Sequence, residues 1–232
     1  HRLVTEKFGI QKIALVVGWS MGGIQSFQWG ASYPDMVERI APFCGGAKTW
    51  PQTYVVLDGM KDALMATIGF DSSKLNQLTT EDMRAVGRVY AGWGLSQAYY
   101  REKLYREMEF DSLEKFVTGI YENSFMKMDP HNFLAMLWTG QNADISANPS
   151  YNGDFEEALR SIHALAYIMP GSTDLFCTAD ENEYEANLIP NASFSPIESI
   201  WGHFAGRGIN RVDNKFIDDN LKRLLALSKK DI

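Results

Sequence analysis

The stretch IALVVGWSMGGIQSFQWG joins an uninterrupted apolar run to a segment with helical spacing, through a turn of glycines and one serine. The run at residues 13–18 is aliphatic and β-branched, which is typical of a strand covered on both faces. Residues 22–33 carry apolar side chains at helical spacing, and Pro34 ends this helix. Residues 37–44 (VERIAPFC) supply a second strand. This β-α-β order predicts a right-handed crossover in an α/β domain with a parallel sheet.

The turn itself, GWSMG, matches the pattern G-x-S-x-G at residues 18–22. In one interpretation it is a tight strand-to-helix turn that needs only small residues. In the other it is a nucleophile elbow, in which Ser20 is held on a sharp bend with its hydroxyl exposed. The motif alone is compatible with both interpretations, so the rest of the chain has to decide.

The remaining segments predict a core interrupted by an insertion. Residues 48–149 contain long polar and aromatic stretches without strand-like runs, and we predict that they form a helical insertion over the serine, called the lid below. Strand patterns return at residues 164–169 (ALAYIM) and 195–201 (SPIESIW). Residues 215–229 predict a final helix with one apolar face. The core is therefore expected at residues 1–47 and 150–232. Candidate lid residues lining a substrate site are Trp93, Tyr99, Tyr100 and Trp138.

Composition narrows the possible partners. Lys plus Arg number 22 and Asp plus Glu 29, giving a formal charge of −7, which disfavours nucleic acid or an anionic membrane as the partner and favours a small neutral molecule. Cys44 and Cys177 are too few for a disulfide framework, which indicates a reducing compartment such as the cytoplasm. Neither a membrane-spanning run nor a signal-peptide pattern is present. No zinc-type cluster or nucleotide fingerprint occurs, so we expect no metal and no cofactor.

Three polar residues follow the predicted strands in a meaningful order. Ser20 follows the first strand, Asp174 follows ALAYIMPGST, and His203 follows SPIESIWG. A serine hydroxyl becomes a strong nucleophile when an imidazole removes its proton and a carboxylate orients that imidazole. Each residue alone has a structural explanation, as a turn residue or a hydrogen-bonded core histidine. Their order at three strand ends favours a catalytic triad.

The other histidines compete weakly with His203 for the role of base. His1 is the first residue, and His163 precedes a predicted strand rather than following one. His131, inside the lid, is the only plausible rival.

Three longer segments resemble one family, the homoserine O-acetyltransferase branch of the α/β-hydrolase fold. LVVGWSMGGIQSFQWGASYPDMVERI resembles its nucleophile elbow and following helix, with the S-M-G-G and Y-P-D elements. FMKMDPHNFLAMLWTGQNADIS is similar to its segment with an Asp-x-x-Asn pair and a final Asp. STDLFCTADENEYEANLIPNASF followed by GHFAG resembles its acid and histidine segment. The resemblance covers nearly the whole chain and implies a mostly parallel sheet flanked by helices, with a helical lid insertion.

The resemblance also implies roles. Ser20 becomes the acyl-accepting nucleophile, His203 the general base and Asp174 its orienting carboxylate, with the backbone N–H of Met21 as one oxyanion-hole donor. The family's second donor comes from a loop upstream of the elbow. Only nineteen residues precede Ser20, so we expect the N-terminal strands of the fold to be missing from this chain. They would come from an N-terminal part of the same fold or from a complementing chain. A homodimer is also possible.

Two departures from the family's pattern bear on the substrate. Homoserine-acylating members have an acid after the catalytic histidine that helps to hold the substrate's amino group, whereas this chain has Phe204. The family's elbow reads G-G-S-M-G, whereas Trp19 precedes the serine here. Trp19 and Phe204 are therefore expected substrate contacts. An amino-acid zwitterion between them would be left with unpaired charge, which is costly to bury. Asp129 and Asp144 in the lid are possible substitutes for the acid.

Three functions remain open at this point. The first is hydrolysis of an ester or related acyl compound through an acyl-enzyme on Ser20. The second is transfer of an acetyl group from acetyl-CoA, as co-substrate, to an alcohol, because water and an alcohol can resolve the same acyl-enzyme. The third is a non-catalytic binding domain on the same fold, which predicts loss of a triad residue.

Overall fold

The computed structural model describes residues 1–227, and within them four parallel strands form one sheet. The strands are β1 (Val16–Trp19), β2 (Arg39–Phe43), β3 (Leu165–Ile168) and β4 (Ala192–Phe194), and they lie side by side in that order. The connection from β1 to β2 runs through α1 (Met21–Ser32). The predicted α/β architecture with a parallel sheet is therefore present.

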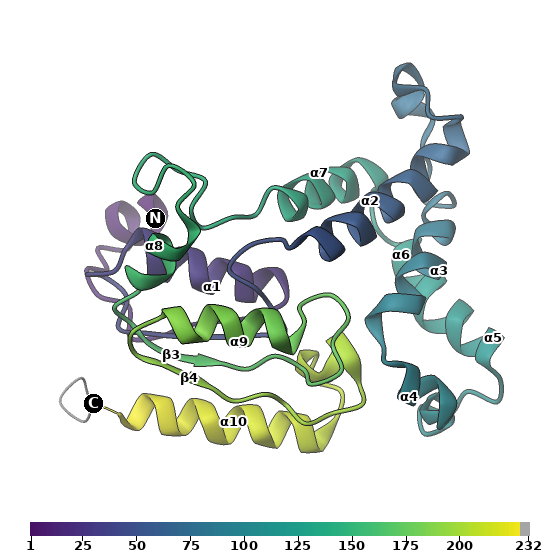
Figure 1. Ribbon diagram of the computed structural model, residues 1–232. Helices are drawn as coiled ribbons and strands as arrows, with labels where there is room; N and C mark the ends of the chain where they lie inside the picture. The colour runs from purple at the N-terminus through teal and green to yellow at the C-terminus, as the bar shows by residue number, and fades with distance from the viewer. Residues whose placement is uncertain (228–232) are drawn as a thin grey trace.

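Helices cover both faces of the sheet (Figure 1). On one face, Phe27 of α1 packs in a cluster with Ile40 and Ala166, which α8 (Phe155–Arg160) and α9 (Ala179–Leu188) complete. On the other face, α10 (Arg211–Ala226) contributes Leu224 to a cluster with Leu165. Figure 1 shows α9 and α10 on opposite sides of β3 and β4. Burial on both faces explains why these strands read as continuous apolar runs.

The expected strand at residues 195–201 is wrong. The last strand is β4, which ends at Phe194, and after it Ile197 makes only an isolated bridge to Gly171. Pro196 has no N–H to continue a ladder. Beyond it, the Ser199 hydroxyl donates to Asp213 and accepts from the N–H of Trp201, so the chain turns.

The final helix begins earlier than the apolar pattern indicated. Its first residue is Arg211, because the side-chain oxygen of Asn210 accepts hydrogen bonds from the N–H groups of Val212 and Asp213 and so caps the helix. The helix ends at Ala226. Positions 228 and 229 of the expected helix lie outside the described residues.

The lid contains helices and turns, with no strand assigned among its described residues. Its longest helix, α2 (Pro51–Met65), packs against both α7 (Pro130–Gln141) and α3 (Met83–Gly94). Figure 1 shows this group standing to one side of the sheet, away from both ends of the chain. Shorter elements complete the lid and the N-terminal segment: η1 (Leu3–Lys7), η2 (Ala66–Ile68), η3 (Ser72–Gln77), α4 (Gln97–Arg101), η4 (Leu104–Arg106), α5 (Leu113–Phe116), η5 (Val117–Glu122) and α6 (Asn123–Phe125).

The lid joins the core through two chain segments that run antiparallel. Lys48 bridges Asp144, the N–H of Thr49 donates to the carbonyl of Ala143 (2.8 Å), and the N–H of Ile145 donates to that of Ala47 (3.1 Å). Because these bonds link the outgoing and returning segments, the lid is anchored by a short ribbon rather than by two independent loops.

Glu185 of α9 fastens this ribbon to the core. The fully buried carboxylate accepts hydrogen bonds from the N–H of Ala47 (3.0 Å) and the indole of Trp50 (2.9 Å). Burial raises the pKa of Glu185 from 4.5 to about 8, against the opposing effect of those two donors. Next to it, the Asn182 amide oxygen is buried without a partner in residues 1–227, while its nitrogen lies 3.4 Å from Glu185. Rotating the Asn182 amide by half a turn would exchange its nitrogen and oxygen, so that the oxygen would accept a hydrogen bond from the proton of neutral Glu185.

We predict that Glu185 makes the protein less stable as pH rises. The folded-state pKa of Glu185 lies above the unfolded value of 4.5, so neutral Glu185 contributes its full stabilisation to the folded protein below pH 4.5. This contribution is lost as pH rises through about 8. Glu185→Gln keeps an oxygen acceptor for Ala47 and Trp50 but does not titrate. Thermal unfolding midpoints between pH 5 and 9 should therefore fall less steeply with pH in the variant. Glu183→Gln, exposed on the same helix, is the control, and equal slopes in all three proteins would contradict the prediction.

Candidate active site

Ser20 occupies the single residue between the last residue of β1 and the first of α1. Its backbone has φ 56° and ψ −119°, a conformation that non-glycine residues rarely adopt. The N–H of Ser20 donates to the carbonyl of Phe43 (3.1 Å), and its carbonyl accepts from the N–H of Ile24 (3.0 Å). The sharp bend that the nucleophile-elbow interpretation requires is present.

Glycine is needed around this bend because backbone segments touch. A Cβ atom on Gly18 would lie 2.4 Å from the carbonyl carbon of Gly22, and one on Gly45 would lie 2.7 Å from the backbone carbonyl oxygen of Ser20. A Cβ on Gly22 would meet nothing within 4 Å. The first glycine of G-x-S-x-G is therefore a steric requirement here, whereas the last is not.

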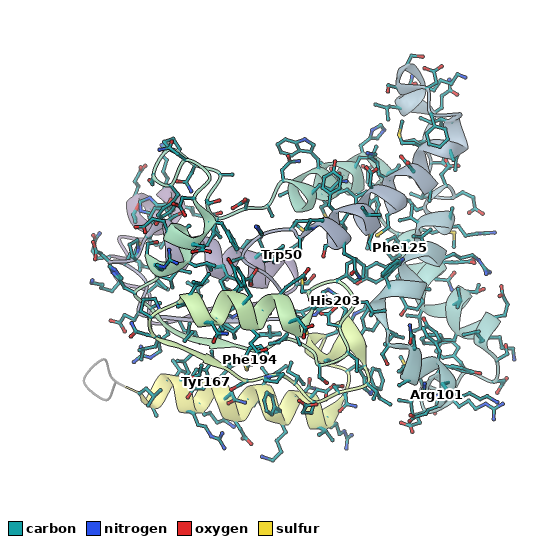
Figure 2. The ribbon with its side chains drawn as sticks, in the orientation of Figure 1. Trp50, Arg101, Phe125, Tyr167, Phe194 and His203 are labelled. Carbon is teal, nitrogen blue, oxygen red and sulfur yellow. The ribbon has the colours of Figure 1, made fainter. Side chains whose placement is uncertain are left out.

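The triad residues expected from the sequence are brought together. The Nε2 atom of His203 lies 2.8 Å from the Ser20 hydroxyl, and its Nδ1 atom lies 2.8 Å from Oδ2 of Asp174. Asp174 and His203 are both buried, and the other carboxylate oxygen of Asp174 accepts from the N–H of Phe176 (2.8 Å). Figure 2 shows His203 where the sheet domain meets the lid. This geometry allows proton transfer from serine to imidazole while the carboxylate fixes the imidazole tautomer.

Met21 lies where an oxyanion-hole donor is expected. It is the first residue of α1, directly after Ser20. The first N–H groups of a helix have no intrahelical acceptor, and they form the positive end of the helix dipole. The Met21 N–H is therefore available to an anionic oxygen next to Ser20.

Trp19 holds the histidine loop in addition to contacting the site. Its indole N–H donates to the carbonyl of His203 (2.9 Å), and the two rings lie 5.2 Å apart. A Cβ on Gly206 would come within 2.4 Å of the Trp19 ring, so glycine is required there. The bulky residue in the elbow is thus part of the scaffold that positions the base.

A cavity of about 460 Å³ opens above Ser20 and His203. Its floor comes from the core, and its walls come from α2, α7, η5 and α6 of the lid. The lining residues are Trp19, Ser20, Met21, Ile24, Thr49, Thr53, Leu57, Met60, Tyr90, Ile120, Tyr121, Ser124, Phe125, Met128, Phe133, Met136, Leu137, Gly140, Phe176, Cys177, His203 and Arg207. Figure 2 labels Phe125 on the lid side of the site. A volume in this range is typical of small-molecule sites.

Several expected lining residues lie elsewhere. Tyr99 is fully buried, Trp93 packs in the lid core, and the Tyr100 hydroxyl donates to the carbonyl of Ala91. Trp138 is 68% exposed. Tyr99 and Tyr100 belong to a cluster that the lid shares with the sheet, and Trp93 belongs to a cluster made mostly of lid residues. A large apolar ring gives the same sequence pattern whether it is buried in such a cluster or lines a ligand site.

Phe204, also an expected substrate contact, does not line the cavity. It is buried behind it, against the rings of Trp19, Tyr90 and Tyr121. The tight turn η6 (Gly202–Gly206) sends consecutive side chains in different directions, so His203 faces Ser20 while its neighbour enters the core.

The candidate substitute acids have structural roles. Asp129 caps α7 by accepting from the N–H of Asn132, and Asp144 accepts from the N–H and hydroxyl of Ser146. Neither lines the cavity, and neither does His131, the rival histidine.

Sequence reasoning missed the cavity wall made by α2 and α7. Thr53, Leu57 and Met60 of α2 recur every three or four residues, as do Phe133, Leu137 and Gly140 of α7. This spacing marks one face of each helix. The aromatic residues that the sequence favoured lie on other faces of the lid.

Among residues 1–227, no group of His, Cys, Asp and Glu is arranged to hold a metal ion. In the same residues, no helix has both the length and the apolar character needed to cross a bilayer.

We predict opposite effects of alanine at the two ends of the motif. Gly18→Ala should lower the free energy of unfolding by about 1–3 kcal/mol or more, because its Cβ meets rigid backbone. Gly22→Ala should be neutral or stabilise α1 by up to about 1 kcal/mol, since it enters open space in a helix. Urea unfolding of both variants measures the difference. Equal destabilisation would show that the backbone contact does not constrain the elbow.

Comparison with known proteins identifies relatives along nearly the whole chain, although no family model matches it. An ethyl acetate hydrolase from Pseudomonas veronii is 33% identical over 228 residues, which are 97% of this chain and 65% of the relative. A homoserine O-acetyltransferase from Nostoc punctiforme is 25% identical over 218 residues, or 88% of this chain and 59% of the relative.

A solved structure agrees with the sequence comparison. The crystal structure of an acetylester hydrolase from Corynebacterium glutamicum superposes with a TM-score of 0.91 at 30% identity, covering 97% of this chain and 65% of that one. The chain thus spans about two thirds of the length of such relatives.

Proposed function

Because the chain belongs to the α/β-hydrolase superfamily, in the branch that holds acetyl esterases and homoserine O-acetyltransferases, we propose that it hydrolyses an ester through an acyl-enzyme on Ser20. The observation that carries this proposal is the hydrogen-bonded chain of Ser20, His203 and Asp174, with both links at 2.8 Å, on the floor of a cavity. A relative named ethyl acetate hydrolase supports the same reaction.

The proposed chemistry follows from the geometry. His203 Nε2 takes the proton of the Ser20 hydroxyl as the oxygen attacks the ester carbonyl, and Asp174 stabilises the imidazolium that forms. The Met21 N–H donates to the oxygen that becomes negative in the tetrahedral intermediate. His203 then returns the proton to the leaving alcohol. Water repeats the sequence on the acyl-enzyme and releases the acid. These steps need no metal or cofactor.

The cavity favours water over homoserine as acyl acceptor. Among the described residues that line it, Arg207 and His203 are the basic ones and none is Asp or Glu, so no carboxylate there pairs with an ammonium group. This observation replaces the expectation built on Phe204, which does not reach the cavity. Acyl transfer from acetyl-CoA to an alcohol remains the second candidate, because homoserine O-acetyltransferases are among the relatives. The assembled triad disfavours a purely binding role.

The sheet supports a further part of this proposal. β1 pairs only with β2 among the described strands, and Val17 on it is 44% exposed. We propose that an N-terminal part of the same fold, or a complementing chain, pairs with this edge, as an unpaired apolar edge strand promotes aggregation. That the protein forms a homodimer is a proposal that comes from the sequence alone. The free thiols of Cys44 and Cys177 suit a cytoplasmic location.

We predict that the triad acts as a unit on the full-length protein. Ser20→Ala should abolish labelling by a fluorophosphonate probe, and loss of Ser20, His203 or Asp174 should lower turnover of 4-nitrophenyl acetate roughly 10⁴-fold or more. His131→Ala, which removes an exposed lid histidine, is the matched control and should keep full activity. Full activity in His203→Ala would refute the assignment.

We predict that homoserine is a poor acceptor. Sites that pair a buried substrate charge discriminate by factors of roughly 10⁴, and no acid lines this cavity among residues 1–227. Steady-state kinetics with acetyl-CoA should therefore show CoA release that homoserine does not accelerate. Saturable, homoserine-dependent release far faster than release into water would establish the transferase instead.

A further inference from the structure

The cavity above Ser20 is divided by polarity. Its catalytic end holds the Ser20 hydroxyl and the His203 imidazole. The α2 and α7 wall of its lid end is lined mainly by aliphatic, thioether and phenyl side chains, Leu57, Met60, Phe133, Met136 and Leu137, and Phe125 of α6 belongs to the same lining. The polar lid residues Tyr90, Tyr121 and Ser124 lie on α3, η5 and α6, outside that wall. An acetyl group is much smaller than a cavity of about 460 Å³, so the lid end provides space that an acetate ester of a short alcohol does not fill.

The two threonines in this wall do not make it polar. The Thr49 hydroxyl donates to the carbonyl of Gly140, and the Thr53 hydroxyl donates to that of Phe176. Each hydroxyl proton is thus already committed to the backbone. An incoming polar group would find no free donor at either threonine, and burying such a group without a partner is unfavourable.

Among the described lining residues, the one permanent charge is Arg207, which comes from the core and not from the lid. The guanidinium of Arg207 stacks 4.4 Å from the ring of Phe204, in the segment that follows His203, and the side chain is exposed. A cationic group in contact with solvent and an aromatic face does not need a buried anion. The walls contributed by α2 and α7 contain no charged residue among the described lining positions.

We propose that the lid end of the cavity binds an uncharged alkyl chain of the ester, longer than an ethyl or acetyl group. This inference rests on the proposed ester hydrolysis and names its substrate class. The chain belongs to either the acyl or the alcohol moiety, since both extend from the carbonyl carbon that Ser20 attacks. Each methylene moved from water into such a wall favours binding, and the gain corresponds to about a fourfold higher kcat/KM per methylene.

The test uses two ester series on the full-length protein. In 4-nitrophenyl esters from acetate to octanoate the acyl chain grows, and in alkyl acetates from ethyl to hexyl the alcohol chain grows. We expect kcat/KM to rise about fourfold per methylene over the first several methylenes in one series, which identifies the moiety that enters the lid. A flat or falling profile in both series, with acetate esters still hydrolysed, would overturn the proposal.

A binding measurement separates this inference from the reaction itself. Calorimetric titration of the Ser20→Ala variant with 1-butanol, 1-hexanol and 1-octanol should show affinity rising about fourfold per methylene with a negative heat-capacity change. This result would support the alkyl site even if no ester were hydrolysed, an outcome that would sink only the proposed function. Equal affinities for the three alcohols would overturn the alkyl site.

A matched pair of glycine variants locates the site. Gly140→Leu projects a side chain into the cavity, where a Cβ already comes within 3.3 Å of Leu57, and should remove the gain with chain length. Gly59→Leu makes the same change on the exposed face of α2, where a Cβ meets nothing within 4 Å, and should retain the gain. If Gly140→Leu does not fold, Leu57→Phe narrows the same wall. An unchanged chain-length profile in the folded variant would place the alkyl chain elsewhere.

Discussion

The backbone of Ser20 is the constraint on which the rest of the site depends. A non-glycine residue at φ 56° costs on the order of 1–3 kcal/mol, and the surroundings must hold it there. Two hydrogen bonds, to Phe43 and from Ile24, fix the residue from both sides. Close contact of Gly18 with Gly22, and of Gly45 with Gly23, leaves no room for the turn to relax. The direction of the serine side chain is therefore set by packed backbone.

Parallel strands bring the other two triad members to the same place. Asp174 lies in the segment after β3 and His203 in the segment after β4, and the carboxyl ends of parallel strands meet at one edge of a sheet. Trp19, itself the last residue of β1, reaches across to the carbonyl of His203. The nucleophile strand thus positions its own base through a hydrogen bond as well as through the shared sheet.

The lid gives this edge a low-polarity roof. It is attached by a ribbon of backbone bonds between residues 47–49 and 143–145, which Glu185 fastens to α9. Lid aromatics such as Tyr99 also pack in one cluster with Trp201 of the core. Hydrogen bonds and charges act more strongly where water is excluded, so an apolar roof strengthens the electrostatic action of the triad and of the Met21 amide. The same apolar character restricts what else can share the cavity with the reacting carbonyl.

Local sequence patterns could predict most of the fold and the identity of the triad. The apolar run before Ser20 and the helix after it have local causes, as do the strand before Asp174 and the helical character of the lid. Predictions from local patterns were wrong where contacts between residues far apart in the chain determine the local structure. Residues 195–201 look like a strand but turn because Ser199 bonds to Asp213, and Trp93, Tyr100 and Phe204 look like ligand contacts but fill cores.

The sequence by itself thus determined the first three strands along the chain and the residue types of the triad, since both follow from spacing and composition along the chain. Only the tertiary structure decided which side chains face the substrate. A helix shows the same periodicity whether its apolar face covers a cavity or a neighbouring helix. Whether the apolar faces of α2 and α7 cover a cavity or a neighbouring helix depends on how the two helices cross above Ser20. That crossing is fixed by contacts between residues far apart in the chain.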